Sequence, residues 1–129
     1  MRDYQAIKNN PYLLPQTLYR RIIGLVRDYD RLKEQYHEIL HESPEPPDGQ
    51  PRGTRKSDPT ERKAMRLAVI SAEMQAVEQA LVIVPPEYRE DIMDNIICGA
   101  RYPDYTGVRT YQRWKQRFIY GVAWNLMLV

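Results

Sequence analysis

Hydrophobic residues recur at alternating intervals of four and three positions through the first third of the chain. This interval places every apolar side chain on one side of an α-helix, so it is typical of a long amphipathic helix with a coiled-coil-like seam. Pro15 suits the first turn of such a helix, and no proline interrupts the pattern before Pro44. The pattern predicts one continuous helix over residues 15–42, with the seam Leu18, Ile22, Leu25, Tyr29, Leu32, Tyr36 and Ile39.

A second seam of similar length follows a strong helix start at Asp58. Asp58 is a preferred capping residue, Pro59 fits the first helical position, and Glu61 stands three positions after the cap, as in a capping box. A helix is therefore predicted over residues 58–84, with the apolar positions Leu67, Ile70, Met74, Val77, Leu81 and Val84. Because two long seams joined by one loop hide each other from water, we expect a long antiparallel helical hairpin.

The segment between these two helices, residues 43–57, is rich in proline and glycine and nearly free of apolar side chains. Proline and glycine oppose a regular helix, and a segment with nothing to bury gains little by ordering. We therefore expect a disordered loop. Its Arg52, Arg55 and Lys56 suit either an exposed tether or contact with phosphates.

Two shorter helices are predicted in the last third of the chain. Pro85 and Pro86 end the preceding helix, and a short helix follows, with Gly99 as its C-terminal cap and the buried stripe Tyr88, Ile92 and Ile96. A final helix begins near Val108. No stretch alternates between polar and apolar residues as a strand does. The prediction is an all-α chain in which residues 1–129 form a single helical domain. The domain consists of the hairpin, a short helix and a C-terminal basic helix. The last two helices, within residues 86–129, are the candidate for recognising a ligand.

Composition and size limit the class of protein. The chain has 129 residues, 43% of them hydrophobic, which is enough for the core of one domain. Its apolar runs are far shorter than the ~20 residues that span a bilayer, and residues 1–5 lack the apolar region of a signal peptide. The single cysteine, Cys98, excludes an internal disulfide and suits a reducing compartment. We expect a cytoplasmic protein without membrane contact.

Positive charge is concentrated in the last quarter of a chain whose net charge is only +2. From Gly99 onward one acid, Asp104, accompanies five basic residues: Arg101, Arg109, Arg113, Lys115 and Arg117. A basic end on a nearly neutral protein favours a polyanionic partner. An ordinary solvated helix face explains the charge equally well.

The arrangement of residues around the final helix favours the first of these explanations. At about 100° per residue, the apolar residues share one arc: Tyr111, Trp114, Phe118, Ile119, Val122 and Leu126. The opposite arc, which we call the Arg/Gln face, holds Arg109, Gln112, Arg113, Gln116 and Arg117 and no acid. Arginine and glutamine are the side chains that bind guanine and adenine edges, and arginine also binds phosphate. Since solvent-exposed faces usually mix charges of both signs, the pattern indicates a helix that contacts nucleic acid.

The run from Thr110 to Tyr120 also resembles the C-terminal helix of the phage RinA/ArpU-type late transcription regulators, which carry the pattern S/T-x-x-R-W-K/R-x-x-F/I-I/L. Those proteins are related in fold to the sigma-factor region that reads promoters with a helix-turn-helix. The resemblance implies that Trp114 and Phe118 are buried anchors and that four residues contact bases or phosphates: Gln112, Arg113, Gln116 and Arg117. Residues 99–108 form a longer connection than the turn of an ordinary helix-turn-helix.

Other residues with chemical potential give weaker signals. His37 and His41 share a helix face, but a zinc site needs a third and a fourth ligand, and no zincin motif surrounds them. Cys98 ends an apolar stripe and is predicted to be a buried structural thiol. No phosphate-binding glycine loop is present. We therefore expect no catalytic site, no cofactor and no metal.

The sequence thus predicts a non-enzymatic helical regulator that binds double-stranded DNA, and the resemblance implies a transcriptional regulator of phage or prophage type. The candidate protein partners are RNA polymerase and another phage protein. A second copy of the chain is also a candidate, in a homodimer through the heptad seams or the apolar C-terminus. The alternatives are a helical protein–protein interaction module and a phage DNA-packaging subunit.

Overall fold

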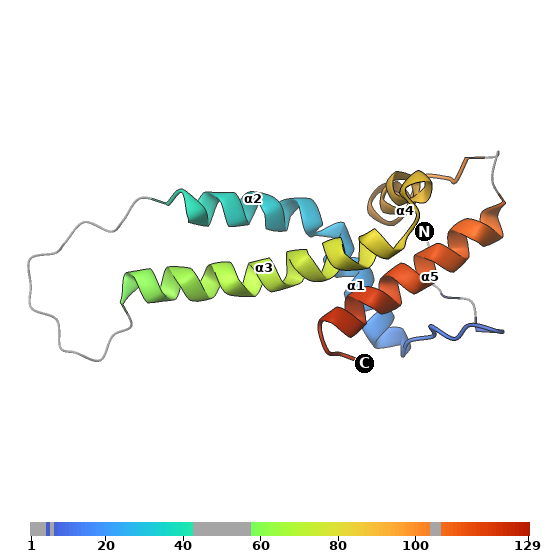
Figure 1. Cartoon of the computed structure of the whole chain (residues 1–129), viewed down its shortest axis with the longest axis horizontal. Coiled ribbons are helices and arrows are strands. Elements are labelled where there is room, and N and C mark those ends of the chain that lie inside the picture. Colours follow the sequence, from blue (N-terminus) through green and yellow to red (C-terminus); the bar gives the residue numbers. More distant parts are fainter. Residues whose placement is uncertain (1–4, 6, 43–57, 104–106) are drawn as a thin grey trace, which may run out of the picture.

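A computed structural model describes residues 5, 7–42, 58–103 and 107–129. Within these residues the chain forms five helices and no strand (Figure 1), so the prediction of an all-α fold is confirmed. The predicted disordered loop, residues 43–57, lies outside the described residues. The helices are α1 (Gln16–Arg27), α2 (Tyr29–Leu40), α3 (Pro59–Ile83), α4 (Pro86–Cys98) and α5 (Val108–Asn125).

The helices form a head and an arm (Figure 1). In the arm, residues 29–42 and 58–74, α2 runs beside the N-terminal half of α3. In the head, α1, α4 and α5 pack around one another and around the C-terminal half of α3. The head contains the main core, whereas only three residues of the arm are buried: Leu32, Ile39 and Ile70.

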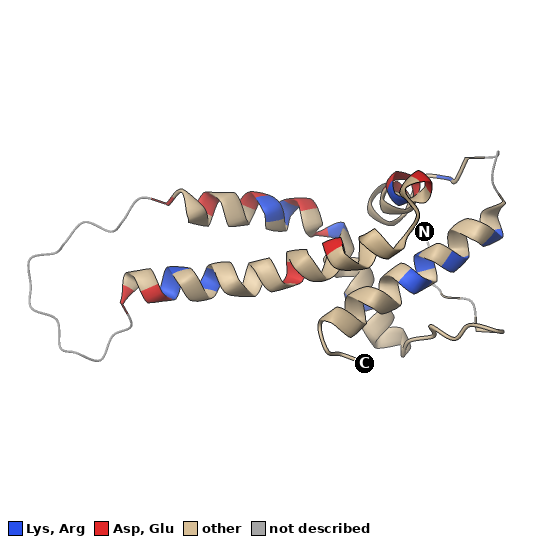
Figure 2. Ribbon diagram, in the orientation of Figure 1, with Lys and Arg blue, Asp and Glu red and all other residues tan. Residues whose placement is uncertain are grey.

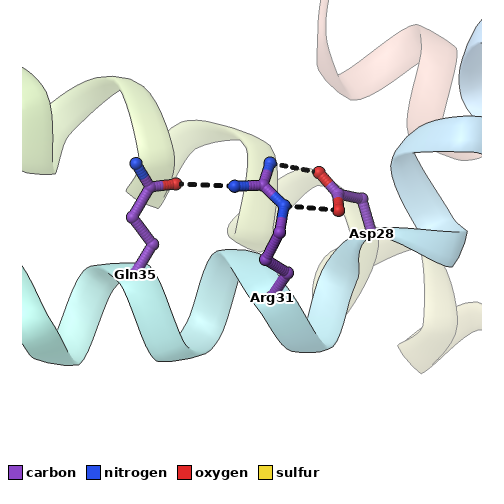
Figure 3. A network of polar contacts seen from close by, with 3 residues as sticks. All are labelled: Asp28, Arg31 and Gln35. Carbon is purple, nitrogen blue, oxygen red and sulfur yellow. Dashed lines mark hydrogen bonds and ion pairs between the residues drawn. The ribbon is translucent and has the colours of Figure 1, made fainter.

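The predicted continuous helix over residues 15–42 is broken at Asp28. This residue has φ −89° and ψ 0°, and it separates two helices of 12 residues each. Its carboxylate accepts two hydrogen bonds from the guanidinium group of Arg31, which also donates to Gln35 over 3.4 Å (Figure 3). This hydrogen bonding with Arg31 lowers the pKa of Asp28 below its ordinary value. Aspartate is less favourable inside a helix than at its ends, so it suits this position between two helices.

The break divides the predicted seam between two cores. Ile22 packs in the head and Leu32 in the arm, while Leu25 contacts both cores. At the end of α1, Nε of Arg27 donates a 2.9 Å hydrogen bond to the carbonyl of Ile96 in α4. The hairpin predicted from residues 15–42 is therefore wrong in its first half, because α1 packs against α4 and α5 and only α2 accompanies α3.

The second predicted helix is correct in its start and in its seam. The carboxylate of Asp58 accepts a 3.0 Å hydrogen bond from the backbone N–H of Thr60. All six predicted seam residues are buried or half-buried, and the last of them, Val84, directly follows α3. The seam did not include Ala76 and Ala80, which are buried on another side of α3, against α5.

The contact between α3 and α5 is close because its residues are small. A Cβ atom at Gly121 would lie 3.2 Å from the Cβ of Ala80. One turn further along, the side-chain amide of Asn125 donates a 3.1 Å hydrogen bond to the carbonyl of Ala76. These contacts set the position of α5 on the head and thereby the direction in which its outer face points.

Two further predictions concern the ends of α4 and α5. Gly99 caps α4 with φ 70°, as predicted, but Cys98 is exposed, so the predicted buried thiol is wrong: the helix ends there and turns this side chain outward. After α5, Leu126 and Leu128 pack on the head core, whereas Met127 is exposed. None of the described helices has the length and apolar character of a membrane span.

The close contact between α3 and α5 predicts opposite effects of added side-chain volume at two glycines. Gly121→Leu forces α5 away from Ala80 and should lower the free energy of unfolding by about 1–3 kcal/mol. Gly24, inside α1, has no atom within 4 Å of an added Cβ. Gly24→Ala should therefore raise the free energy of unfolding by about 0.5–1 kcal/mol, because alanine favours the helix. Urea denaturation followed by circular dichroism measures both, and equal effects would contradict the close packing.

Candidate nucleic-acid interface

The Arg/Gln face lies on the outer side of α5, as its spacing predicts. The opposite side of the helix is fully buried and includes Tyr111, Phe118, Ile119, Val122 and Ala123. Arg109, Arg113 and Arg117 are exposed, and Gln112 and Gln116 are half-buried between them. The three arginines follow one another at intervals of four residues, about 6 Å along the helix axis. The structure therefore brings all five predicted residues together on one surface.

No acidic side chain interrupts this surface. α5 has no aspartate or glutamate, and Figure 2 shows its basic residues without acidic ones among them. Within the described part of the chain, none of the three arginines forms an ion pair. In contrast, the arm carries both signs (Figure 2), and there Arg66 pairs with Glu42 at 3.3 Å. An uncompensated row of guanidinium groups attracts anions over the range of the Debye length.

Trp114 differs from the role that the resemblance implies. Phe118 is a buried anchor, as the resemblance implies, but Trp114 is only half-buried. The indole of Trp114 lies under the guanidinium of Arg117, 5.6 Å from it, because its position on the helix is at the border between the two faces. Lys115 points to the other border, where its Nζ donates a 2.9 Å hydrogen bond to Asn95 of α4. Lys115 therefore adds to the charge of α5 but not to the Arg/Gln face.

An aromatic cluster, and no tight turn, joins α4 to α5. The ring of Tyr102 stacks on Tyr111 at 4.5 Å, and Tyr88 contacts Tyr111 edge-on at 5.2 Å. The hydroxyl of Tyr111 donates a 2.8 Å hydrogen bond to Asp91. Burial raises the pKa of Tyr102 to about 12. The arrangement differs from an ordinary helix-turn-helix, since packing and hydrogen bonds hold the two helices across residues 99–107, of which 104–106 lie outside the described residues.

Asn95 is the centre of the polar contacts in this connection. Its side-chain amide donates a 2.8 Å hydrogen bond to the carbonyl of Ala100. Its side-chain oxygen accepts hydrogen bonds from the hydroxyl of Tyr102 over 3.1 Å and from Lys115. One asparagine thus holds α4, the connection and α5 in register. No pattern in the sequence indicates this role, because a single asparagine near a helix end is common.

Residues 9–12 of the N-terminal segment lie beside the Arg/Gln face, and we call them the wall. The sequence did not predict this contact. The side chain of Gln5 forms hydrogen bonds with both the N–H and the carbonyl of Leu14, whose side chain is buried. The ring of Tyr12 lies 5.4 Å from that of Tyr120 on α5. These contacts hold the segment against the helix.

An open pocket of about 350 Å³ lies between this wall and α5. It is lined on one side by the N-terminal segment and on the other by the predicted face and its neighbours: Asn9, Pro11, Tyr12, Thr110, Arg113, Trp114, Gln116 and Arg117. Guanidinium groups, amides and an indole ring in one pocket provide anion binding, hydrogen bonding and stacking together. The wall leaves the arginines exposed but narrows access to the helix from one side.

His37 and His41 stack their rings at 6.5 Å on the arm. Among the described residues no group of three side chains of the metal-binding types lies together. Comparison of the chain with protein-family models, with curated proteins and with solved structures finds no match.

The raised pKa of Tyr102 predicts a loss of stability in alkaline solution. Because the folded protein holds this hydroxyl protonated above its ordinary pKa of 10.0, the stabilisation is complete below pH 10 and is lost as the pH rises towards 12. Tyr102→Phe keeps the ring stack and removes the titrating group. The variant should lose less of its unfolding free energy between pH 10 and 12 than the wild type does. Chemical denaturation at a series of pH values tests this, and an unchanged pH dependence would contradict it.

Proposed function

We propose that the protein is a non-catalytic DNA-binding regulator of phage or prophage type, acting in the cytoplasm, whose Arg/Gln face contacts double-stranded DNA. The single observation that supports this most is the row formed by Arg109, Arg113 and Arg117. These side chains are exposed, uncompensated by acids and fixed on a helix whose opposite side is the centre of the core. A rigid helix that presents positive charge in one direction suits a polyanion of regular shape.

The contacts fall into two kinds. The arginines provide attraction to phosphates, which supplies most of the affinity and falls steeply with salt. Gln112 and Gln116, between the arginines, provide hydrogen bonds that can distinguish bases. The resemblance of residues 110–120 to the RinA/ArpU-type recognition helix agrees with these roles. The wall formed by Asn9 to Tyr12 restricts how deeply a groove can admit the helix, so phosphate contacts by Arg113 and Arg117 carry more of this proposal than base reading does.

The alternative function is a helical protein–protein interaction module, and the pocket favours it. A pocket of about 350 Å³ with a half-buried indole and two guanidinium groups also suits an acidic side chain or a carboxylate of a protein partner. A phage DNA-packaging subunit, the third candidate, would share the DNA-binding surface. A test of DNA binding distinguishes the regulator and the packaging subunit, which would bind DNA, from the protein-interaction module, which would not.

Binding of labelled duplex DNA, followed by fluorescence anisotropy over a series of salt concentrations, tests the proposal. We expect the logarithm of the binding constant to fall linearly with the logarithm of salt concentration. Arg113→Ala/Arg117→Ala should weaken binding at least roughly tenfold at low salt and reduce the salt slope by about two, one for each arginine.

The matched control is Lys33→Ala/Lys63→Ala, which removes the same charge from the arm. It should leave the salt slope within about half a unit of the wild type. If the control weakens binding as much as the α5 variant, general charge and not the Arg/Gln face binds DNA. Absence of binding at ~50 mM salt, where phosphate contacts are strong, would reject the proposal and favour the protein-interaction module.

A further inference from the structure

The pocket between the wall and α5 holds more kinds of side chain than attraction to DNA requires. Its lining includes two guanidinium groups, the amides of Asn9 and Gln116, the indole of Trp114 and the ring of Tyr12, and it includes no acid. Its volume of about 350 Å³ lies at the low end of the ~300–1,000 Å³ that small-molecule sites occupy. The pocket therefore suits one small ligand and is far too small for a DNA duplex.

The wall side of the pocket is held in place by its own backbone. Asn9 has φ 56°, in the left-handed region that asparagine adopts more readily than most residues. The side-chain oxygen of Asn10 accepts a 2.9 Å hydrogen bond from the N–H of Tyr12, and Gln5 accepts one of 3.0 Å from the N–H of Leu14. The pocket is therefore formed before a ligand binds, which lowers the entropic cost of binding.

On the α5 side of the pocket, positive charge and a flat ring lie next to each other. The guanidinium of Arg117 is 5.6 Å from the centre of the Trp114 ring, and Arg113 precedes it by one turn of the helix. Guanidinium groups bind phosphate oxygens through paired hydrogen bonds. An indole provides a π-surface on which any base can stack. This side of the pocket thus suits a phosphate attached to a flat ring.

We propose that this pocket binds a single nucleotide, with its phosphate on the two guanidinium groups and its base between Trp114 and Tyr12. The edge of a base carries both hydrogen-bond donors and acceptors, and so do the amides of Asn9 and Gln116. A carboxylate from a protein partner would use the guanidinium groups, but it only accepts hydrogen bonds and has no ring to stack. A nucleotide therefore matches more of the pocket than a carboxylate does.

Nucleotide binding would be a second property of this surface, distinct from duplex binding. The two ligands would share Arg113 and Arg117, which line the pocket, whereas Arg109 lies outside it. A bound nucleotide would therefore compete with DNA, a consequence that rests on the DNA-binding function proposed above.

Isothermal titration calorimetry of the full chain at low salt, with AMP as the probe and without DNA, tests the pocket. We expect AMP to bind at least roughly tenfold more tightly than inorganic phosphate, because stacking adds to the phosphate contact. Adenosine, which lacks the phosphate, should also bind at least roughly tenfold more weakly than AMP. An affinity for AMP no greater than that for inorganic phosphate would show an anion site only and overturn the proposal.

Two arginines of the same row provide a matched pair of variants. Arg113→Ala should weaken AMP binding roughly tenfold, whereas Arg109→Ala, the same change outside the pocket, should weaken it less than about threefold. Tyr12→Ala removes the ring on the wall side and should weaken AMP binding roughly fivefold or more, with a smaller effect on phosphate. Circular dichroism checks that each variant is folded. Equal losses in Arg109→Ala and Arg113→Ala would overturn the proposal, since net charge alone would explain them.

Two further ligands identify the source of the nucleotide and test a protein partner. A short single-stranded oligonucleotide with a 5′-phosphate should bind as tightly as AMP if the ligand is a strand end, and more weakly if it is a free nucleotide. An acidic peptide that binds more tightly than AMP would overturn the proposal in favour of a protein partner. Duplex binding is measured separately, so AMP binding without duplex binding rejects only the DNA-binding function, and the reverse result rejects only the nucleotide site.

Discussion

The close approach of α5 to α3 is the contact on which the rest of the head depends. Because Gly121 has no side chain and Ala80 has a short one, the two helices come near enough to bury the whole inner side of α5. Because Phe118, Ile119 and Val122 are buried against the core, the residues on the other side of the helix point to solvent. The exposure of the arginine row is thus a consequence of packing at the back of the same helix, and the function proposed for it rests on that rigidity.

The sequence predicted the helices well wherever hydrophobic periodicity and caps agree. The stripes of α3, α4 and α5 follow from spacing alone, and Asp58 and Gly99 mark helix ends by their side-chain chemistry. The break at Asp28 was not predictable in this way, because the heptad spacing continues through it without a proline. It arises from tertiary structure: Arg27 binds the carbonyl of Ile96 in α4, and Ile22 and Leu32 pack in different cores, so the two halves of one periodic segment separate at Asp28.

For the candidate interface, the sequence provided the members of the Arg/Gln face but not its surroundings. A helical wheel divides a helix into faces, and it correctly separated the arginines from Tyr111 and Phe118. It cannot show which other segment lies beside a face. The wall formed by residues 9–12 comes from a stretch without periodicity, fixed by Gln5, and no local pattern indicates that contact. Trp114 lies at the border of the two faces, where spacing alone does not decide between core and pocket.

α3 differs from an ordinary amphipathic helix because it has two apolar sides. One side carries the seam that packs on α2, and the other carries Ala76 and Ala80, which pack on α5. At about 100° per residue, Met65 and Val69 fall on this second side, so α5 covers it in the head and leaves it exposed in the arm. The exposed apolar residues of the arm therefore continue a helix side whose contact with α5 is made in the head.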